Sequence, residues 1–458
     1  MARPSCSRSS RRGFLQRGIS ALAAWCLPEW VPSRVVAAEG RPGVNDAVRV
    51  GVIGCGIRGK NLIGNLPPES RVVALCDCYL PRMTETLKPE ASSQYAAILA
   101  DFVQRDSARC VMYQDYRRML DEAALDAVII AAPDHHHVLA ATLACQAGLD
   151  VYCEKPLSLT IDEGRRLVQA VRRHGRVLQV GSQQRSMELD RFGCQLVREG
   201  KLGRISHVDL PNWASPLTYE GLPPDTMPAG MDWDAFCGPT PLHPYHWRLW
   251  QKDERDWEGR RWRGWDMWRD YSGHLVTNWG AHAVDIAQWA LGMDATGPVE
   301  IEPLSTTYGG DARTCPMLAR YANGVELRMA GVKGLSAGGM FYGERGRIAI
   351  DRNRFQVDPP DLVPDPPDPA LAQIWEGPGI VARPHLQNWI DCIKTRREPN
   401  APVETGHRTV TICHLFNIAR QVRRKLVWDP IRETILDDEE ACRLLERPRR
   451  AGWELPRS

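Results

Sequence analysis

The sequence predicts an α/β protein: an N-terminal unit with a parallel sheet, followed by a C-terminal α+β unit with a large, mostly antiparallel sheet. Three observations predict this fold. Residues 48–53 form a β-rich run that leads into a glycine-rich turn and a helical stretch. Strand-like and helix-like runs then alternate as far as Gly181. Beyond Gly181 the pattern changes to short strands separated by turns, which is typical of antiparallel sheet.

The composition is that of a globular protein. The 458 residues suggest two or three domains of roughly 150 residues each. With 43% hydrophobic and 25% charged residues, the chain is not of a disordered, collagen-like or many-spanning class. The 58 Lys+Arg and 56 Asp+Glu leave a net charge of +2, which does not indicate binding to nucleic acid or to an acidic membrane. We therefore expect a small-molecule partner.

No metal site is predicted. The 14 cysteines include no CxxC pair and no zinc-finger-like block with histidines. Histidines 135–137 are consecutive, so their side chains diverge and rarely converge on one ion.

The first 38 residues read as a targeting segment. Ser10-Arg11-Arg12-Gly13-Phe14-Leu15-Gln16 is followed by a mildly apolar stretch at 19–27 and by the small-residue site Val36-Ala37-Ala38. This resembles a twin-arginine signal peptide cleaved near Ala38; the alternative is a cytoplasmic chain with a basic leader. The apolar stretch is shorter than the roughly 20 residues of a transmembrane helix, so we expect export to the periplasm without membrane insertion after cleavage.

A dinucleotide site is predicted in the first domain, residues 46–182. The turn Gly54-Cys55-Gly56-Ile57-Arg58-Gly59 lies between a strand and a helix, where glycines permit a tight turn and close approach of the backbone to a pyrophosphate. The phosphates would lie at the helix N-terminus, where free N–H groups and the dipole favour anions. We expect Gly54, Gly56, Ile57, Arg58 and Gly59 to contact the cofactor. An empty scaffold of the same fold is the alternative.

The next strand indicates which dinucleotide binds. Residues 71–76 end at Asp77, 18 residues after Gly59. A carboxylate there suits the ribose hydroxyls of NAD and repels the 2′-phosphate of NADP. Arg82 lies close enough in sequence to offer a phosphate partner, so NADP remains the less favoured alternative.

The rest of the first domain continues the strand–helix alternation. A buried strand at 125–132 is closed by Pro133, and a helix at 138–147 ends at Gly148. A strand at 150–153 leads into Glu154-Lys155-Pro156, and a helix at 161–174 and a strand at 176–180 complete the unit.

The second domain is expected over 183–430, with a tail at 431–458. It contains a helix at 190–199, a strand at 204–210, and hairpins at 318–330 and 340–351, the first turning at Asn323-Gly324. The proline-rich residues 358–369 predict a surface loop, and helices return at 384–395 and 409–425. In the last helix Ile412, Leu415 and Phe416 begin an apolar stripe at helical spacing that indicates core.

Three blocks in this order resemble one family: the glycine turn, Pro133-Asp134-x-x-His137, and Glu154-Lys155-Pro156. They are similar to the glucose-fructose oxidoreductase and inositol dehydrogenase family, Gfo/Idh/MocA, and most to its exported twin-arginine branch. The resemblance runs from about residue 48 to the segment 447–453. It implies a Rossmann domain in which Pro133, Asp134, His137, Glu154, Lys155 and Gln183 join the cofactor site.

The resemblance also implies a catalytic set. Family members use the motif lysine, here Lys155, with a downstream Asp-x-x-x-His on a helix; the matching segment here runs from Asn278 to His282, with Asp285 three residues later. Helical spacing places Asn278, His282, Asp285 and Trp289 on one face, too apolar in its neighbours for a solvent-exposed helix. An amide at 278 cannot take a proton, so the role of general base moves to His282, and Lys155 becomes a hydrogen-bond donor to the reacting oxygen.

Tryptophan is concentrated in and around this segment: of 16 tryptophans, half fall between Trp247 and Trp289. The stretch 245–271 predicts either aromatic packing within the chain or a subunit interface. The alternative is a platform for a sugar ring, in which Trp268 would contact the substrate. Asn278, His282 and Arg185 are further candidate substrate contacts, although Arg185 could equally form an ordinary salt bridge.

The expected function is an NAD-dependent oxidoreductase that acts on a ring hydroxyl of a sugar, polyol or glycoside. Export would favour tightly bound NAD that is recycled within one catalytic cycle. The first alternative is therefore an NAD-dependent glycosidase or epimerase that oxidises its sugar transiently. The second is a non-catalytic sugar-binding protein of the same fold. We expect a homodimer or homotetramer.

Overall fold

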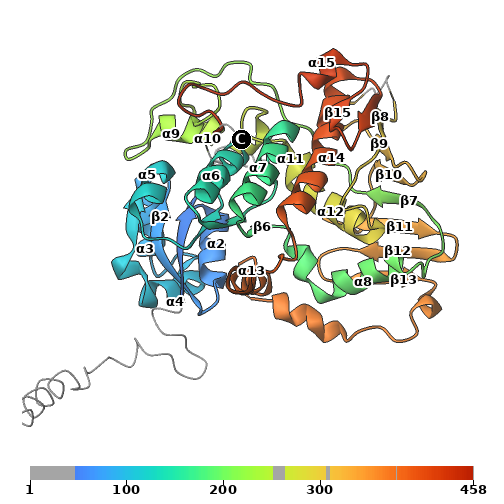
Figure 1. The fold of residues 1–458 in the computed structure, drawn as a ribbon, viewed down its shortest axis with the longest axis horizontal. Coiled ribbons are helices and arrows are strands. Elements are labelled where there is room, and N and C mark those ends of the chain that lie inside the picture. The colour runs from blue at the N-terminus through green and yellow to red at the C-terminus, as the bar shows by residue number, and fades with distance from the viewer. Residues whose placement is uncertain (1–46, 251–263, 306–309, 378, 457–458) are drawn as a thin grey trace, which may run out of the picture. The chain divides into compact units, whose positions relative to one another are not determined.

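The first domain is built on a six-stranded parallel sheet in the order β3-β2-β1-β4-β5-β6 (Figure 1). The computed structural model describes residues 47–250, 264–305, 310–377 and 379–456; the predicted leader, Trp257 and Trp262 lie outside these ranges. The strands are β1 (Val48–Ile53), β2 (Ser70–Cys76), β3 (Val111–Tyr113), β4 (Ala127–Ile130), β5 (Asp150–Cys153) and β6 (Leu178–Val180). The strand order reverses between β1 and β4, where sheets of this kind bind ligands.

Helices connect these strands: α2 (Ile57–Asn65), α3 (Leu80–Leu87), α4 (Ala96–Arg105), α5 (Tyr116–Glu122), α6 (Asp134–Gln146) and α7 (Ile161–His174), with a short turn η2 (Ser107–Arg109). The predictions for β1, β5 and α7 are confirmed at both ends. Helix α6 begins four residues before its predicted start, because the polar residues after Pro133 are buried in its first turn and not exposed in a loop.

The second domain carries a nine-stranded sheet in the order β13-β12-β11-β7-β10-β9-β8-β14-β15, antiparallel except where β7 pairs with β10. Its strands are β7 (Ile205–Leu210), β8 (Glu300–Pro303), β9 (Met317–Arg320), β10 (Glu326–Met329), β11 (Gly339–Gly343), β12 (Gly346–Ile350), β13 (Phe355–Asp358), β14 (Leu426–Asp429) and β15 (Thr434–Ile435). Both predicted hairpins are confirmed, and Gly324 has a positive φ of 86° in the turn of the first.

The helices of the second half are α8 (Glu188–Arg198), α9 (Trp233–Cys237), α10 (Trp247–Trp250), α11 (His274–Asn278), α12 (Gly280–Leu291), α13 (Arg383–Thr395), α14 (Val403–Val422) and α15 (Glu439–Cys442). Shorter turns are η3 (Gln183–Ser186), η5 (Trp265–Met267), η6 (Ala312–Thr314), η7 (Pro360–Leu362) and η8 (Pro369–Trp375). The predicted proline-rich loop thus contains η7 and leads into η8.

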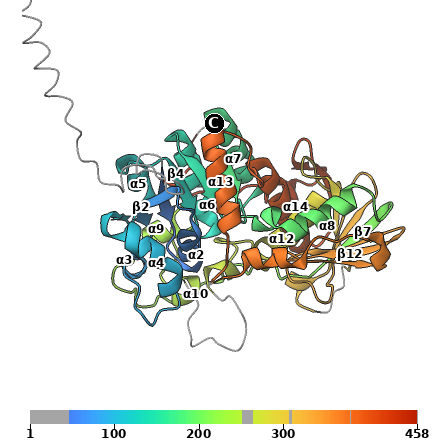
Figure 2. The same cartoon turned by 90° about the horizontal axis from the view of Figure 1, so that it is seen from below.

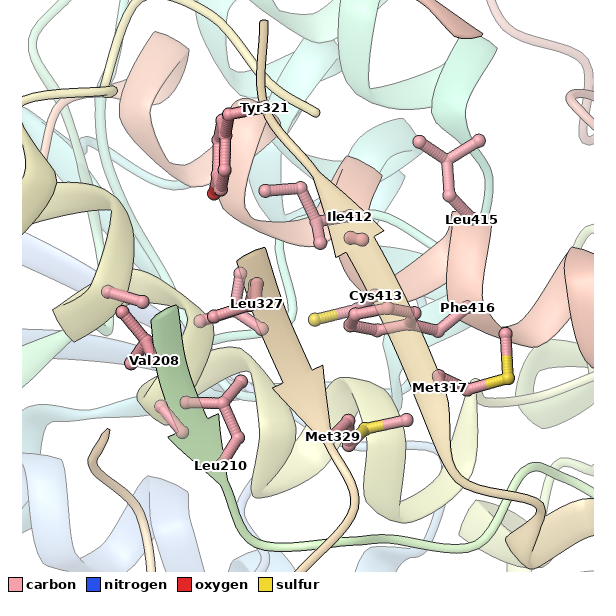
Figure 3. Packing of buried hydrophobic residues seen from close by; sticks show 14 of the residues in the cluster. Val208, Leu210, Met317, Tyr321, Leu327, Met329, Ile412, Cys413, Leu415 and Phe416 are labelled. Atoms are coloured by element: carbon pink, nitrogen blue, oxygen red, sulfur yellow. The ribbon is translucent and has the colours of Figure 1, made fainter. Parts of the chain in front are cut away.

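The core of the second domain lies between the sheet and α14. Figure 3 shows Val208 of β7 and Leu327 of β10 facing Ile412 and Phe416 of α14. All four side chains are buried, and each such burial contributes about 1.5–3 kcal/mol. The predicted apolar stripe is therefore confirmed as core, and α12, which packs against α14, is held on the same face of the sheet.

Helix α13 completes the first domain although it comes late in the sequence. It packs against α2 (Figure 2). Its Trp389 is fully buried, with its ring centroid 5.7 Å from that of Tyr152 on β5. The segment 383–395, predicted within the second domain, therefore belongs to the core around the parallel sheet.

The C-terminal segment returns to the first domain and lies beside α6 and α7 (Figure 1). Arg447 and Arg449 both donate to one oxygen of Glu163, in the first turn of α7, at 2.7 and 2.6 Å. The Glu163 carboxylate is buried, and both guanidinium groups are partly buried against it. Burial acts to raise its pKa, but the two arginines outweigh burial and lower it.

Replacement of Glu163 by glutamine should destabilise the fold by about 2–3 kcal/mol, because two partly buried guanidinium groups lose their counter-charge. Since the folded pKa is lowered, the carboxylate stabilises the fold above its unfolded pKa, and this contribution fades as the pH falls through the folded value. Urea unfolding from neutral to acid pH measures both effects. The exposed pair Arg118–Glu122 is the control: Glu122→Gln should change the unfolding free energy by less than about 1 kcal/mol.

The described residues contain neither a helix suited to crossing a membrane nor a cluster of metal-binding side chains. None of the helices in these ranges is both long and apolar enough to cross a membrane. Within the same ranges, no three His, Cys, Asp or Glu side chains are grouped as a metal site would require.

Candidate active site

A cavity of about 820 Å³ lies at the edge of the parallel sheet where β1, β4 and β5 end. Its walls come from both domains: the glycine turn, the ends of β2 and β3, and the Glu154–Lys155 turn on one side, and η5, α11 and α12 on the other. The predicted residues that line it are Gly54, Gly56, Ile57, Arg58, Asp77, Pro133, Asp134, His137, Glu154, Lys155, Gln183, Asn278 and His282.

The three glycines of the turn have different environments. A Cβ on Gly54, whose φ is 93°, would lie 2.5 Å from the carbonyl oxygen of Ala131, and one on Gly59 would lie 2.0 Å from that of Gly54. Gly59 does not line the cavity, so its contribution is close packing of α2 on the strand. A Cβ on Gly56 would meet no atom within 4 Å. This open space at the N-terminus of α2 fits a pyrophosphate.

Replacement of Gly56 by alanine should therefore separate cofactor binding from folding. Gly56 has a φ of −69°, which alanine adopts, so thermal stability should stay within about 0.5 kcal/mol of the original. NAD affinity should fall at least about tenfold, because the methyl group takes the space at which the phosphates approach the backbone. Fluorescence titration with NADH and a thermal melt measure the two quantities.

Two comparisons make the Gly56 result decisive. Gly59→Ala should unfold at lower temperature, and Gly297→Ala, outside the cavity with open surroundings, should resemble the original protein in both assays. Unchanged NADH affinity in Gly56→Ala would contradict the assignment of this turn to the phosphates.

Asp77 lies at the end of β2 with its carboxylate fixed by the backbone. Its Oδ2 accepts a hydrogen bond from the Cys55 N–H at 2.8 Å, and its Oδ1 accepts one from the Tyr79 N–H at 3.0 Å. Arg82, the alternative partner for a 2′-phosphate, lies 3.5 Å from Oδ1 and 4.3 Å over the ring of Trp250. A buried, fixed carboxylate at this position favours the ribose hydroxyls of NAD.

Lys155 is at the centre of the polar wall. Its Nζ donates to Oδ1 of Asn278 at 2.6 Å. The neighbouring Glu154 accepts from Arg58 Nε at 2.6 Å, and Arg58 also donates to Gln183 Oε1 at 2.8 Å. Burial lowers the pKa of Lys155, against the opposing charges of Glu154 and Asp134. The structure thus brings together the lysine and the amide that replaces the family's aspartate.

His282 lies on the same wall, near the start of α12. It is 7% exposed, and no described residue forms a hydrogen bond with its imidazole. Burial lowers its pKa well below the usual value, with further contributions from Arg352, Lys155 and Arg58. The ring is therefore neutral near pH 7 and able to accept a proton. Arg352, which sequence reasoning missed, also lines the cavity, 5.1 Å over the ring of Trp279.

Two carboxylates lie near Lys155. Asp134 begins α6 and accepts from Ser272 Oγ at 2.7 Å, and burial raises its pKa to about 7. Asp266 of η5 was not predicted. Its Oδ2 is buried, forms no hydrogen bond with a described residue, and lies 3.9 Å from Nδ1 of His274. Burial raises the pKa of Asp266 to about 6, so this wall holds two acids that can exchange protons near neutral pH.

His137 has a positioning role that the sequence did not reveal. Its ring nitrogens lie 2.6 Å from the carbonyl oxygen of Pro156 and 2.8 Å from that of Ala132. The imidazole therefore joins the end of β4 to the turn that carries Lys155. Pro133 lies at the cap of α6 between them.

The prediction that Asp285 belongs to the catalytic set is wrong, and of the two alternatives for Arg185 the structure shows the salt bridge and not the substrate contact. Neither residue lines the cavity. Arg185 of η3 donates through Nε to both oxygens of Asp285 at 2.9 Å, and through its other nitrogens to Asp294 at 2.9 and 2.6 Å. Thr409 Oγ1 donates to Asp285 at 3.0 Å. Asp285 lies three residues after His282 on α12, and its contacts with Arg185 and Thr409 direct it towards η3 and α14.

Trp268 is also placed differently from the prediction. It is 6% exposed, packs in an aromatic cluster, and its Nε1 donates to the carbonyl of Arg248 at 2.9 Å. Aromatic packing, not a sugar platform, is therefore the role of this residue. Trp250 and Trp265 of the same region do line the cavity, as does Trp279.

Comparison with known proteins identifies the family. Residues 48–182 match the model of the oxidoreductase family's NAD-binding Rossmann fold, and residues 204–455 match that of its C-terminal alpha/beta domain. The chain belongs to the Gfo/Idh/MocA oxidoreductase family. Its first domain is an NAD-binding Rossmann domain, as the glycine turn and Asp77 predict.

Curated relatives and solved structures similar to this Gfo/Idh/MocA chain include dehydrogenases. The chain is 35% identical to inositol 2-dehydrogenase 1 of Saccharopolyspora erythraea over 137 residues, 27% of this chain and 36% of that one. It spans between 29% and 42% of the length of the curated relatives considered. The WlbA dehydrogenase of Bordetella pertussis, solved with NADH and UDP-GlcNAcA, superposes with a TM-score of 0.55 at 18% identity, over 84% of this chain and 99% of that one.

A second solved neighbour has the same fold. Scyllo-inositol dehydrogenase of Lactobacillus casei, solved with NAD(H) and scyllo-inositol, superposes with a TM-score of 0.52 at 15% identity, over 83% of this chain and 99% of that one. At these identities the superpositions establish the fold: a Rossmann domain followed by a domain with a large, mostly antiparallel sheet.

Proposed function

We propose that this Gfo/Idh/MocA oxidoreductase transfers hydride between NAD and a ring hydroxyl carbon of a sugar, polyol or glycoside. The observation that carries the proposal is the wall formed by Lys155, Asn278 and His282, in the same cavity as the glycine turn. The inositol dehydrogenases among its relatives support a cyclic polyhydroxy substrate.

The residues of the first domain hold the cofactor. The open space at Gly56 and the N-terminus of α2 fit the pyrophosphate, and Asp77 fits the ribose beside it. Glu154 keeps Arg58 and the Lys155 backbone in place. When bound, NAD supplies the hydride acceptor for oxidation of the carbinol carbon.

The residues of the polar wall act on the hydroxyl. Lys155, held by Asn278, donates a hydrogen bond to the reacting oxygen and stabilises the negative charge that develops on it. Neutral His282 accepts the hydroxyl proton. Trp265 and Trp279 line the same cavity, and indole rings are suited to packing on the C–H side of a sugar ring.

The test uses NAD-loaded full-length protein with myo-inositol, scyllo-inositol, glucose and nitrophenyl glycosides. Absorbance of reduced nicotinamide and release of nitrophenol are followed together. Reduced nicotinamide in proportion to oxidised substrate supports the proposal. Nitrophenol release without net reduction would replace the proposal with the redox-cycled glycosidase, and neither signal with any substrate would contradict it.

A further inference from the structure

Arg352, in the turn between β12 and β13, lines the cavity with a guanidinium group that has no polar partner among the described residues. The residue is partly exposed, and its unpaired side-chain nitrogens are accessible. The other lysines and arginines that line the cavity all form hydrogen bonds or ion pairs; they are Arg58, Lys60, Arg82 and Lys155. Arg352 is therefore the cation of this wall that is free to bind a ligand.

The backbone that carries Arg352 is fixed by hydrogen bonds. Its N–H donates to Oε1 of the buried Gln184 at 2.8 Å, and Gln184 Nε2 donates to the carbonyl of Ala337 at 2.9 Å. The N–H of Ala337 in turn donates to Asp351 Oδ1 at 3.0 Å. These contacts hold Arg352 at a positive φ of 52°. The base of the side chain is thus positioned before any ligand binds, which lowers the entropic cost of binding.

Two carboxylates act on the charge of Arg352, but neither is paired with it. Asp351 accepts from two backbone N–H groups and lies 3.5 Å from a nitrogen of Arg354. Asp190 on α8 is buried, and burial raises its pKa to about 8, so this carboxyl group is neutral near pH 7. The guanidinium itself stays charged at that pH. A positive charge at the cavity therefore remains without a counter-charge.

Arg352 belongs to the wall that carries His282. Its guanidinium lies 5.1 Å over the ring of Trp279, which is three residues before His282 and also lines the cavity. Of the charges that lower the pKa of His282, that of Arg352 has the largest effect, ahead of Lys155. The phosphates of NAD are assigned to Gly56 in the first domain. An anionic group at Arg352 would therefore belong to the molecule that reacts at His282.

We propose that Arg352 binds a carboxylate of the substrate, so that the preferred substrates are sugar acids such as uronates. The indole of Trp279 supports the guanidinium and leaves its N–H donors for the two carboxylate oxygens, the bidentate geometry that arginine favours. One guanidinium matches the single charge of a carboxylate, whereas a phosphate monoester carries about two charges. The inference rests on the proposed oxidation and adds the class of its substrate.

The first measurement is binding without turnover. NADH-loaded full-length protein cannot oxidise a carbohydrate, so calorimetry can compare glucuronate with glucose, galacturonate with galactose, and both pairs with glucose 6-phosphate. Each acid should bind about 10- to 100-fold more tightly than its neutral partner, as hydrogen bonds to a charged group allow. Equal affinities of acid and neutral sugar would overturn the inference. Tighter binding of glucose 6-phosphate than of either acid would also overturn it.

Variants of the turn assign the effect to one side chain. Arg352→Met keeps an apolar stem beside Trp279, and Arg352→Lys keeps the charge without the planar donors. Arg354→Met is the matched control, because Arg354 is an exposed cation in the same turn and does not line the cavity.

Arg352→Met should weaken binding of the acids by about 10- to 100-fold and leave the affinities for glucose and NADH within about threefold of the original. Arg352→Lys should fall between the two, because an ammonium group provides charge without a bidentate contact. Arg354→Met should bind every ligand as the original protein does. Thermal melts of all three variants check that they are folded.

Three results with the variants would overturn the inference: unchanged acid affinity in Arg352→Met, the same loss in Arg354→Met, or an equal loss of NADH affinity, which would assign Arg352 to the cofactor. The proposed function fails separately. A protein that binds acids through Arg352 but reduces NAD with no carbohydrate would leave the carboxylate site standing and remove the oxidation. Oxidation of glucose and glucuronate with equal kcat/KM would remove the carboxylate site alone.

Discussion

Replacement of Lys155 by alanine should reduce turnover by about 10²- to 10⁴-fold while NAD remains bound. The side chain donates to Asn278 and lines the cavity beside His282, whereas the contacts assigned to the dinucleotide are made by the glycine turn and Asp77. Turnover of the best substrate and NADH titration measure the two quantities. Activity that survives the substitution unchanged would remove Lys155 from the mechanism.

A second variant at the same contact checks the charge state of Lys155. Asn278→Asp places a carboxylate beside Nζ and should raise the pKa of Lys155, which burial lowers in the original protein. A protonated lysine is needed to donate to the reacting oxygen, so the alkaline limb of the pH–rate profile should move to higher pH. A profile that stays in place would show that the limb belongs to another group.

Replacement of Asp285 by alanine should lower the unfolding free energy by about 3–5 kcal/mol and leave kcat of the folded protein within about threefold of the original. The carboxylate holds the fully buried Arg185, and its loss leaves that charge with Asp294 alone. Urea unfolding and turnover per folded molecule separate the two effects.

The double variant Arg185→Met with Asp285→Leu is the matched control. It removes both buried charges and should recover much of the lost stability, because apolar residues of similar volume can replace a buried ion pair. A stable Asp285→Ala protein with turnover reduced 100-fold or more would instead return Asp285 to the catalytic set.

The residues that sequence alone places correctly are those fixed by a short segment. The turn from Gly54 to Gly59 can be placed from the sequence because a clear strand precedes it and a clear helix follows it. Lys155 can be placed because it comes directly after β5. Asn278 and His282 come from one segment of five residues, which the fold brings to Lys155.

The residues that sequence misplaces or misses depend on contacts between distant segments. Helical spacing from His282 predicts that Asp285 lies on the same face. Its partner Arg185 is 100 positions away in the sequence, and the ion pair between them lies outside the cavity. Asp266 lies in a segment with no motif, and only the folded chain shows that it lines the same cavity as Gly56. The sequence feature that could have indicated Asp266 is its position as a carboxylate among tryptophans, between Trp265 and Trp268.

Transfer of deuterium tests the central claim most directly. NAD-loaded protein is incubated with myo-inositol, scyllo-inositol and glucose deuterated at every ring carbon, and the nucleotide is extracted for mass spectrometry. The account predicts a nicotinamide ring heavier by one deuterium with at least one of these substrates, and none of this label with Lys155→Ala. Nicotinamide that stays unlabelled while the substrate is converted would contradict it.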